Sequence, residues 1–277
     1  MPHILIAEDD RLLSQMLKAV LKVEGFRVAA AFNGEAALKK LRAKQYDLLL
    51  LDVWMPQMNG FEVLSYLREM PSPPRVIVMT TDGTPQSILR AMREQAYQYV
   101  LKPFEPAALV KMVRDALSAD PTVTPIEVLS ARPSWVEILL PCDLRTAARV
   151  EKFMANLRVD LPTETIQMIA HAFHELLLNA VEWGGQLDPN RKVRISFLRT
   201  ERMLLYRIAD PGPGFQFEDL THAATSNPQD DPMRHMEARQ EKGLRPGGLG
   251  LFMTKQIVDE LLYNEKQNEV VFVKYLR

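Results

Sequence analysis

The sequence has one cysteine, almost no net charge and no long apolar run. Because Cys142 stands alone, the chain cannot form an internal disulfide, which is typical of proteins in a reducing cytosol. A net charge of −1 offers no general attraction to nucleic acid or to an anionic membrane. No run of about 18 apolar residues could span a bilayer, and Glu8 comes too early for a secretory signal peptide. We therefore expect a soluble, cytoplasmic protein with no nucleic-acid or membrane partner.

The length of 277 residues is enough for two domains, each with its own core. Residues 119–125 contain two prolines and two threonines, a composition that discourages helix and favours an extended connection. We place the domain boundary there. The predicted organisation is a first domain at 1–118, a linker at 119–133 and a second domain at 134–277.

Short apolar runs alternate with amphipathic segments over the first 118 residues. The run Leu48-Leu49-Leu50-Leu51 is apolar on both faces, as the central strand of a parallel sheet requires. Strands are predicted at 3–7, 27–31, 48–52, 76–80 and 98–101, and helices at 12–23, 34–42, 60–69, 85–95 and 105–117. Five strand–helix repeats predict a doubly wound α/β domain with a parallel sheet.

Charged or polar side chains stand at the carboxyl ends of four of these strands. They are, in chain order, Asp9, Asp10, Asp52, Thr80 and Lys102. Because the carboxyl ends of parallel strands meet at one edge of the sheet, these side chains should converge. Three carboxylates in one crevice repel one another, and a hard cation such as Mg²⁺ relieves that repulsion. Such an ion, together with Lys102, would also neutralise the oxygens of an incoming phosphoryl group.

The motifs of this half form one ordered set: Glu8-Asp9-Asp10, Asp52 followed by Met55-Pro56 and Gly60, Thr80, and Tyr99-Val100-Leu101-Lys102-Pro103. In order and spacing, residues 1–118 resemble the receiver domain of two-component response regulators. The resemblance implies that Asp52 accepts phosphate from an upstream histidine kinase and that Asp9, Asp10 and Asp52 hold Mg²⁺. It also implies that Lys102, Thr80 and Tyr99 report phosphorylation, and the Lys102–Pro103 bond is often cis in that family.

The second half has a different order of elements. Strands are predicted at 134–140, 193–198, 204–208 and 270–275. One amphipathic helix is predicted at 144–157, a second opens at 162–164 and runs to 181, and a third opens at 247–251 and runs to about 262.

Three short motifs accompany these helices and strands. Glu175 and Asn179 lie four residues apart on one helix face, Asp210-Pro211-Gly212-Pro213-Gly214 follows a strand, and Gly248-Leu249-Gly250-Leu251 opens a helix. Each motif alone has an ordinary explanation as a polar helix edge, a pair of tight turns or a plain loop. Their chemistry nevertheless suits a nucleotide, because an amide oxygen can bind Mg²⁺, a carboxylate accepts from an amino group, and glycines permit close backbone approach.

Taken in order, these motifs resemble the ATP-binding domain shared by histidine kinases, type II topoisomerases and Hsp90-type chaperones, over residues 134–276. The resemblance implies an α/β two-layer sandwich of helices over a mixed sheet. It implies that Asn179 orients Mg²⁺ and that Asp210, in a motif with Gly212 and Gly214, hydrogen-bonds the adenine amino group. The second glycine motif, with Gly248 and Gly250, would wrap the phosphates.

Within that superfamily the second half is most similar to the anti-sigma-factor serine kinases of bacterial partner-switching systems, because a strand and a helix lead into the Glu175 motif without a dimerisation helix pair. The hypothesis is a response regulator, phosphorylated on Asp52, that controls an ATP-binding serine/threonine kinase or anti-sigma-type output. Its partner would be an antagonist-like or sigma-factor-like protein. Glu175 is the candidate general base.

Two other functions stay open on the sequence alone. The second half could be an ATP-binding module that sequesters a partner without phosphorylating it. It could also be a histidine-kinase-like catalytic domain acting on a separate phosphoacceptor protein. Phosphorylation of a hydroxyl benefits from a general base, so Glu175 favours the serine kinase over the latter. A homodimer is equally open.

Overall fold

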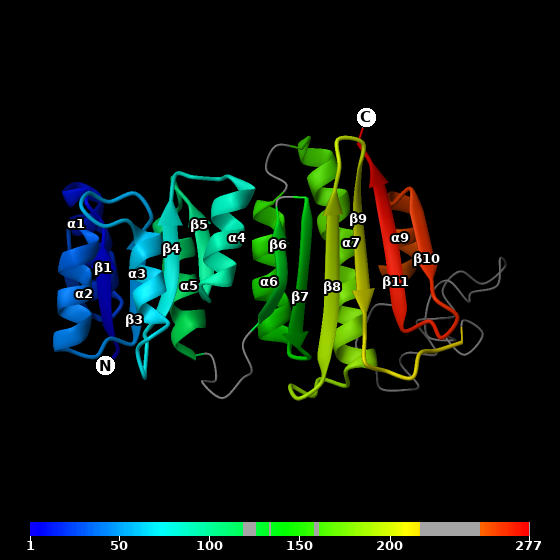
Figure 1. Ribbon diagram of the computed structural model, residues 1–277, viewed down its shortest axis with the longest axis horizontal. Coiled ribbons are helices and arrows are strands. Elements are labelled where there is room, and N and C mark those ends of the chain that lie inside the picture. The colour runs from blue at the N-terminus through cyan, green and yellow to red at the C-terminus, as the bar shows by residue number, and fades with distance from the viewer. Residues whose placement is uncertain (119–125, 133, 158–160, 217–249, 277) are drawn as a thin grey trace. The chain divides into compact units, whose positions relative to one another are not determined.

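The structure is a computed structural model that describes residues 1–118, 126–132, 134–157, 161–216 and 250–276 (Figure 1). It contains two compact units, each built on one sheet. Gly248, which the sequence predicts to bind phosphate, lies outside the described residues.

The first unit has a five-stranded parallel sheet in the order β2-β1-β3-β4-β5. Its strands are β1 (His3–Ala7), β2 (Arg27–Ala31), β3 (Leu48–Asp52), β4 (Arg75–Thr80) and β5 (Gln98–Leu101). The helices between and after them are α1 (Arg11–Val23), α2 (Gly34–Ala43), α3 (Gly60–Leu67), α4 (Pro85–Arg93) and α5 (Pro106–Ser118). This is the doubly wound parallel sheet predicted from the sequence, and the prediction is confirmed.

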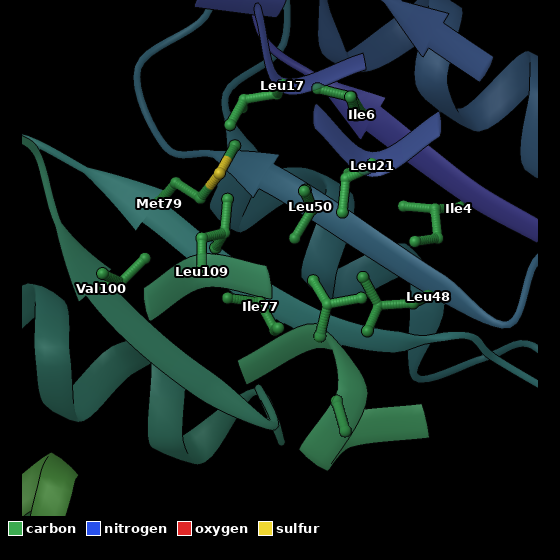
Figure 2. Close-up of a cluster of buried hydrophobic side chains, with 12 residues drawn as sticks. Ile4, Ile6, Leu17, Leu21, Leu48, Leu50, Ile77, Met79, Val100 and Leu109 are labelled. Atoms are coloured by element: carbon green, nitrogen blue, oxygen red, sulfur yellow. The ribbon is translucent and has the colours of Figure 1, made fainter. Parts of the chain in front are cut away.

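Strand β3 is the centre of this unit, because its four leucines are completely buried. Successive side chains of a strand point to opposite faces. Leu48 and Leu50 accordingly join one core cluster with Leu17 and Leu21 of α1 and Leu109 of α5, whereas the two other leucines of β3 do not (Figure 2). Helices α1 and α5 therefore cover one face of the sheet, and β3 is buried on both.

The second unit has a six-stranded sheet in the order β10-β11-β9-β8-β7-β6. Its strands are β6 (Glu127–Arg132), β7 (Trp135–Pro141), β8 (Lys192–Arg199), β9 (Met203–Ala209), β10 (Glu260–Tyr263) and β11 (Glu269–Tyr275). The helices are α6 (Leu144–Asn156), α7 (Thr163–Asn179) and α9 (Gly250–Ile257), and a π-helical turn, η1 (Ala180–Gly184), extends α7. Every described strand pair is antiparallel, so the expectation of a mixed sheet is wrong for this part of the chain.

Aromatic side chains pack between α7 and this sheet. The ring of Tyr206 on β9 lies 5.2 Å from that of Phe173 on α7 and 4.8 Å from those of Phe197 and Phe272 on the neighbouring strands, measured between centroids. Offset and tilted rings at these separations contribute stabilising free energy in addition to that of the apolar area they bury. In Figure 1 helices α7 and α9 lie behind the sheet, which makes the two-layer α/β sandwich predicted from the sequence.

Two strands, β6 and β10, were not predicted from the sequence. Residues 127–132 were assigned to the linker but form β6, which pairs with β7 through an irregular register that breaks the expected alternation. The last helix was expected to reach about residue 262, but α9 ends at Ile257 and β10 follows almost at once. Two adjacent leucines in β10 suit a helix as well as a strand, and pairing with β11 decides between them. Among the described residues no helix is both long and apolar enough to cross a membrane.

The central position of β3 gives a stability prediction. Leu50→Ala should lower the free energy of opening of the first unit by about 2–5 kcal/mol, because it leaves a cavity in a fully buried layer. Leu12→Ala is the matched control, since Leu12 is 78% exposed. Hydrogen exchange of the β1, β3 and β4 amides would measure both effects. Equal protection in the two variants would contradict the assignment of β3 as the core strand.

Candidate functional sites

The first site lies where β1, β3 and β5 end. Glu8 and Asp52 are both buried, and the Lys102 ammonium reaches them together. Lys102 Nζ lies 2.7 Å from Glu8 Oε2 and 2.6 Å from Asp52 Oδ2. The peptide bond between Lys102 and Pro103 is cis. The sequence prediction that Asp52 and Lys102 converge is borne out in position.

Burial and pairing act in opposite directions on these charges. Burial raises the pKa of the Glu8 carboxyl to about 7, although the hydrogen bond from Lys102 opposes the rise. Burial alone would lower the pKa of Lys102, but its hydrogen bonds to Asp52 and Glu8 outweigh that effect and the pKa is raised. The ammonium therefore stays charged beside the two carboxyl groups.

A metal ion would find three carboxylates at this edge. Single oxygens of Glu8, Asp9 and Asp52 all lie within 4.8 Å of one another. A set of carboxylate oxygens fits Mg²⁺, which takes few protein ligands and keeps several waters. The structure thus groups Glu8 rather than Asp10 with Asp9 and Asp52.

Asp10 has a different position. Its Oδ1 accepts hydrogen bonds from the N–H groups of Leu12 (2.8 Å) and Leu13 (3.2 Å), so it caps the first turn of α1. The sequence analysis missed Glu8 as a ligand because it took the last two acids of a run of three. The signal in the sequence was that Glu8 directly follows the apolar strand. The structure shows that Glu8 continues the pairing of that strand, since its N–H donates to Ala31 O.

Thr80 and Tyr99 meet on one loop after β4. The Thr80 Oγ1 accepts a hydrogen bond from the N–H of Asp82 (3.1 Å), and the Tyr99 hydroxyl donates to the carbonyl of the same residue. Since Thr80 Oγ1 serves Asp82 as acceptor, its own O–H proton is not used in that bond. Burial raises the pKa of Tyr99, which therefore keeps its proton.

The second site is built around Asp210, directly after β9. Its Oδ1 accepts a hydrogen bond from the N–H of Gly212 at 2.7 Å. Burial raises the pKa of the Asp210 carboxyl, while that N–H and the Arg191 guanidinium oppose the rise. Arg191 also donates to the carbonyl of Pro211 (2.6 Å), so it holds the loop after β9 as well.

The π-helical turn η1 brings the end of α7 to this carboxylate. A Cβ added to Gly184, the last residue of the turn, would overlap the Asp210 side chain. On its other side, a Cβ added to Gly185 would overlap the thiol of Cys142, which is fully buried and whose pKa is raised by burial to about 11. Turns of this kind recur at functional sites. The sequence analysis missed this glycine pair, although adjacent glycines after a helix signal a close approach.

Glu175 and Gly250 also meet, from α7 and the start of α9. A Cβ added to Gly250 would overlap the Glu175 carboxylate. Asn179 follows Glu175 by one turn, and both side chains are half-buried. The two residues of the asparagine motif and one glycine of the second glycine motif therefore lie on one side of α7. Whether they bind Mg²⁺ or phosphate stays a prediction.

Comparison with known proteins finds two families in the chain. A family model described as "Response regulator receiver domain" matches residues 4–114, and one described as "Histidine kinase-like ATPase domain" matches residues 140–274. "DNA-binding response regulator MtrA" of Mycolicibacterium smegmatis is 33% identical over 182 residues, which cover 66% of this chain and 78% of that protein.

Two further relatives match the first unit. "Transcriptional regulatory protein CpxR" of Escherichia coli is 41% identical over 117 residues, 42% of this chain and 50% of that protein. The solved structure of the response regulator TrrA from Thermotoga maritima is 34% identical, with a TM-score of 0.39, and the match covers 42% of this chain and 99% of that one.

The regrouped carboxylates give a prediction that separates Asp9 from Asp10. Asp9→Asn should weaken Mg²⁺ binding at the first site by at least about 10-fold, the usual cost even of losing an outer partner of a metal ligand. Asp10→Asn should leave it near the native value, because asparagine caps a helix as well as aspartate does. The Mg²⁺ dependence of phosphate gain from acetyl phosphate, followed by intact mass, measures both. An equal loss in the two variants would restore the grouping expected from the sequence.

A second prediction concerns Asp210. Asp210→Asn keeps the acceptor for Gly212 but removes the carboxylate oxygen available to an amino group, so ATP binding should weaken by about 1–3 kcal/mol. Asp188→Asn is a matched control, because Asp188 Oδ1 accepts in the same way from the N–H two residues on, that of Asn190. Titration calorimetry with ATP compares them. Unchanged affinity in Asp210→Asn would remove Asp210 from the nucleotide pocket.

Proposed function

The chain belongs to the response regulator family, and we propose that phosphorylation of Asp52 controls an ATP-dependent protein kinase activity of its second unit. The single observation that carries the proposal is the Lys102 ammonium held between Glu8 and Asp52. A cation beside two buried carboxyl groups has the chemistry of a phosphoryl acceptor site. The match of the second half to a kinase-like ATPase domain supplies the output.

The phosphoryl donor would be an upstream histidine kinase. Asp52 is the nucleophile, and its Oδ2 already faces the Lys102 ammonium. Mg²⁺ held by Glu8, Asp9 and Asp52 would supply the charge that offsets the oxygens of the incoming group. Lys102 would then move from its ion pair with Asp52 to an oxygen of the phosphoryl group.

The phosphate would be sensed through the loop after β4. Phosphorylation adds close to two negative charges and three acceptor oxygens. The Thr80 hydroxyl can donate to one of these, and any movement of Thr80 pulls on Asp82, to which its Oγ1 is already bonded. Because the Tyr99 hydroxyl bonds to Asp82 as well, that movement reaches Tyr99. We propose that this relay changes how the first unit meets the second unit or another copy.

The output would transfer the γ-phosphate of ATP to a hydroxyl of a small antagonist-like protein. Asp210 would accept from the adenine amino group, Asn179 would orient Mg²⁺, and Glu175 would take the proton of the acceptor hydroxyl. The close fit between Glu175 and Gly250 supports this role, because it brings a carboxylate to the helix start that would wrap the phosphates. Gly248, Gly212 and Gly214 would line the same pocket.

The kinase proposal gives a prediction at Glu175. Glu175→Gln keeps the size of the side chain but removes the base, so ATP binding should persist while transfer to a serine falls about 10²–10⁴-fold. Glu164→Gln, on the exposed first turn of the same helix, is the control and should transfer normally. Labelled ATP with antagonist-like proteins measures the transfer.

Three results would contradict parts of this proposal. Full transfer by Glu175→Gln would end its role as a general base. If the native protein binds ATP but labels no antagonist, the second unit is a binding module that sequesters its partner. Labelling of a histidine in a separate protein would instead identify a histidine-kinase-like catalytic domain.

A further inference from the structure

The turn between β10 and β11 has a fixed internal arrangement. The Asn264 Nδ2 donates to Asn268 Oδ1 at 2.9 Å, and the N–H of Asn268 donates to Asn264 Oδ1 at 3.1 Å. The carbonyl end of the Asn268 side chain is thus held inside the turn. Its Nδ2 is thereby directed outward, away from Asn264.

That outward Nδ2 meets the loop that follows β9. It donates to the carbonyl of Gly212 at 3.1 Å, while the carbonyl of Asn268 accepts from the N–H of Asp210 at 2.9 Å. One residue therefore holds the loop at both Asp210 and Gly212. The bond to Gly212 comes from the Asn268 side chain and the bond to Asp210 from its backbone. A substitution of Asn268 can therefore remove the bond to Gly212 and leave the bond to Asp210.

Gly214, the last residue of the loop, also packs closely against the β10–β11 turn. Gly214 has a φ of +86°, and a Cβ added there would overlap the carbonyl of Lys266. No other residue type fits that backbone at that distance. The loop is therefore held against the β10–β11 turn at Asp210, Gly212 and Gly214.

The consequence for Asp210 follows from its own hydrogen bond. The Gly212 N–H donates to Asp210 Oδ1, and the Gly212 carbonyl accepts from Asn268 Nδ2. The position of Asn268 therefore fixes the position of Gly212. Gly212 in turn fixes the rotation of the Asp210 carboxylate. Oδ2 is then the oxygen left for a ligand. Tyr263, the last residue of β10, lies close enough for its pKa to be raised by burial and by the Asp210 charge, which places the same hairpin beside the carboxylate.

We propose that Asn268 is a positioning residue for purine selectivity: through Gly212 it holds Asp210 so that one carboxylate oxygen accepts from a 6-amino group. The proposal rests on the ATP-binding function of the second unit and adds a named determinant of base choice. It makes the β10–β11 turn, which carries no nucleotide motif, part of the base pocket.

The test compares ATP with inosine triphosphate, which has a carbonyl oxygen where adenine has its amino group. The full-length native protein should prefer ATP. Asn268→Ala should reduce that preference by about 3- to 10-fold, the factor for one hydrogen bond, chiefly by weakening ATP binding. Glu265→Ala, an exposed residue of the same turn, should keep the native preference. A merely structural defect would weaken both nucleotides equally and leave the ratio unchanged.

The outcomes are distinguishable. A native protein that binds neither nucleotide overturns the ATP-binding function and the role of Asn268 with it. A native protein that binds both equally keeps the ATP-binding function but overturns the role of Asn268 in base choice. A native preference that survives in Asn268→Ala overturns the role of Asn268 alone. Asn268→Asp, which keeps the acceptor for Asn264 but loses the donor to Gly212, is the second variant if the alanine protein does not fold, and an unchanged ratio there also refutes the proposal.

Discussion

The first unit depends on the pairing of one partly exposed ammonium, that of Lys102, with two buried carboxyl groups. Glu8, Asp52 and Lys102 stand at the carboxyl ends of three strands, and neither carboxylate could be desolvated without a partner at a tolerable cost. Removal of Lys102 would leave the carboxyl groups of Glu8 and Asp52 without their shared cation. The parallel sheet, with β3 buried on both faces, keeps the carboxyl ends of β1, β3 and β5 close together.

Much of the first site could be read from the sequence because its residues stand at strand ends. A leucine run buried on both faces places Asp52, and equivalent runs place Thr80 and Lys102, so convergence follows from topology alone. The choice between Glu8 and Asp10 could not be read in the same way. Three consecutive acids have the same composition signal, and only the backbone direction after β1 decides which one enters the site and which one caps α1.

The second site was predicted as separate motifs, and their assembly was not. Asp210, Gly184 and Asn268 come from three segments far apart in the chain, and they meet through close backbone approaches and single hydrogen bonds that leave no periodic signal. The strands β6 and β10 were missed for a related reason. Each is short or irregular, and its strand character comes from pairing with a neighbour rather than from its own residues.

Control of the second unit by Asp52 is tested most directly by one measurement on the full-length protein. The affinity for ATP and the rate of phosphate transfer should be compared with Asp52 free and with Asp52 carrying beryllofluoride, a stable substitute for the phosphoryl group. If phosphorylation governs the output, at least one of the two values must change, and Asp52→Asn must abolish the change. Identical values in both states would show that the two units act independently.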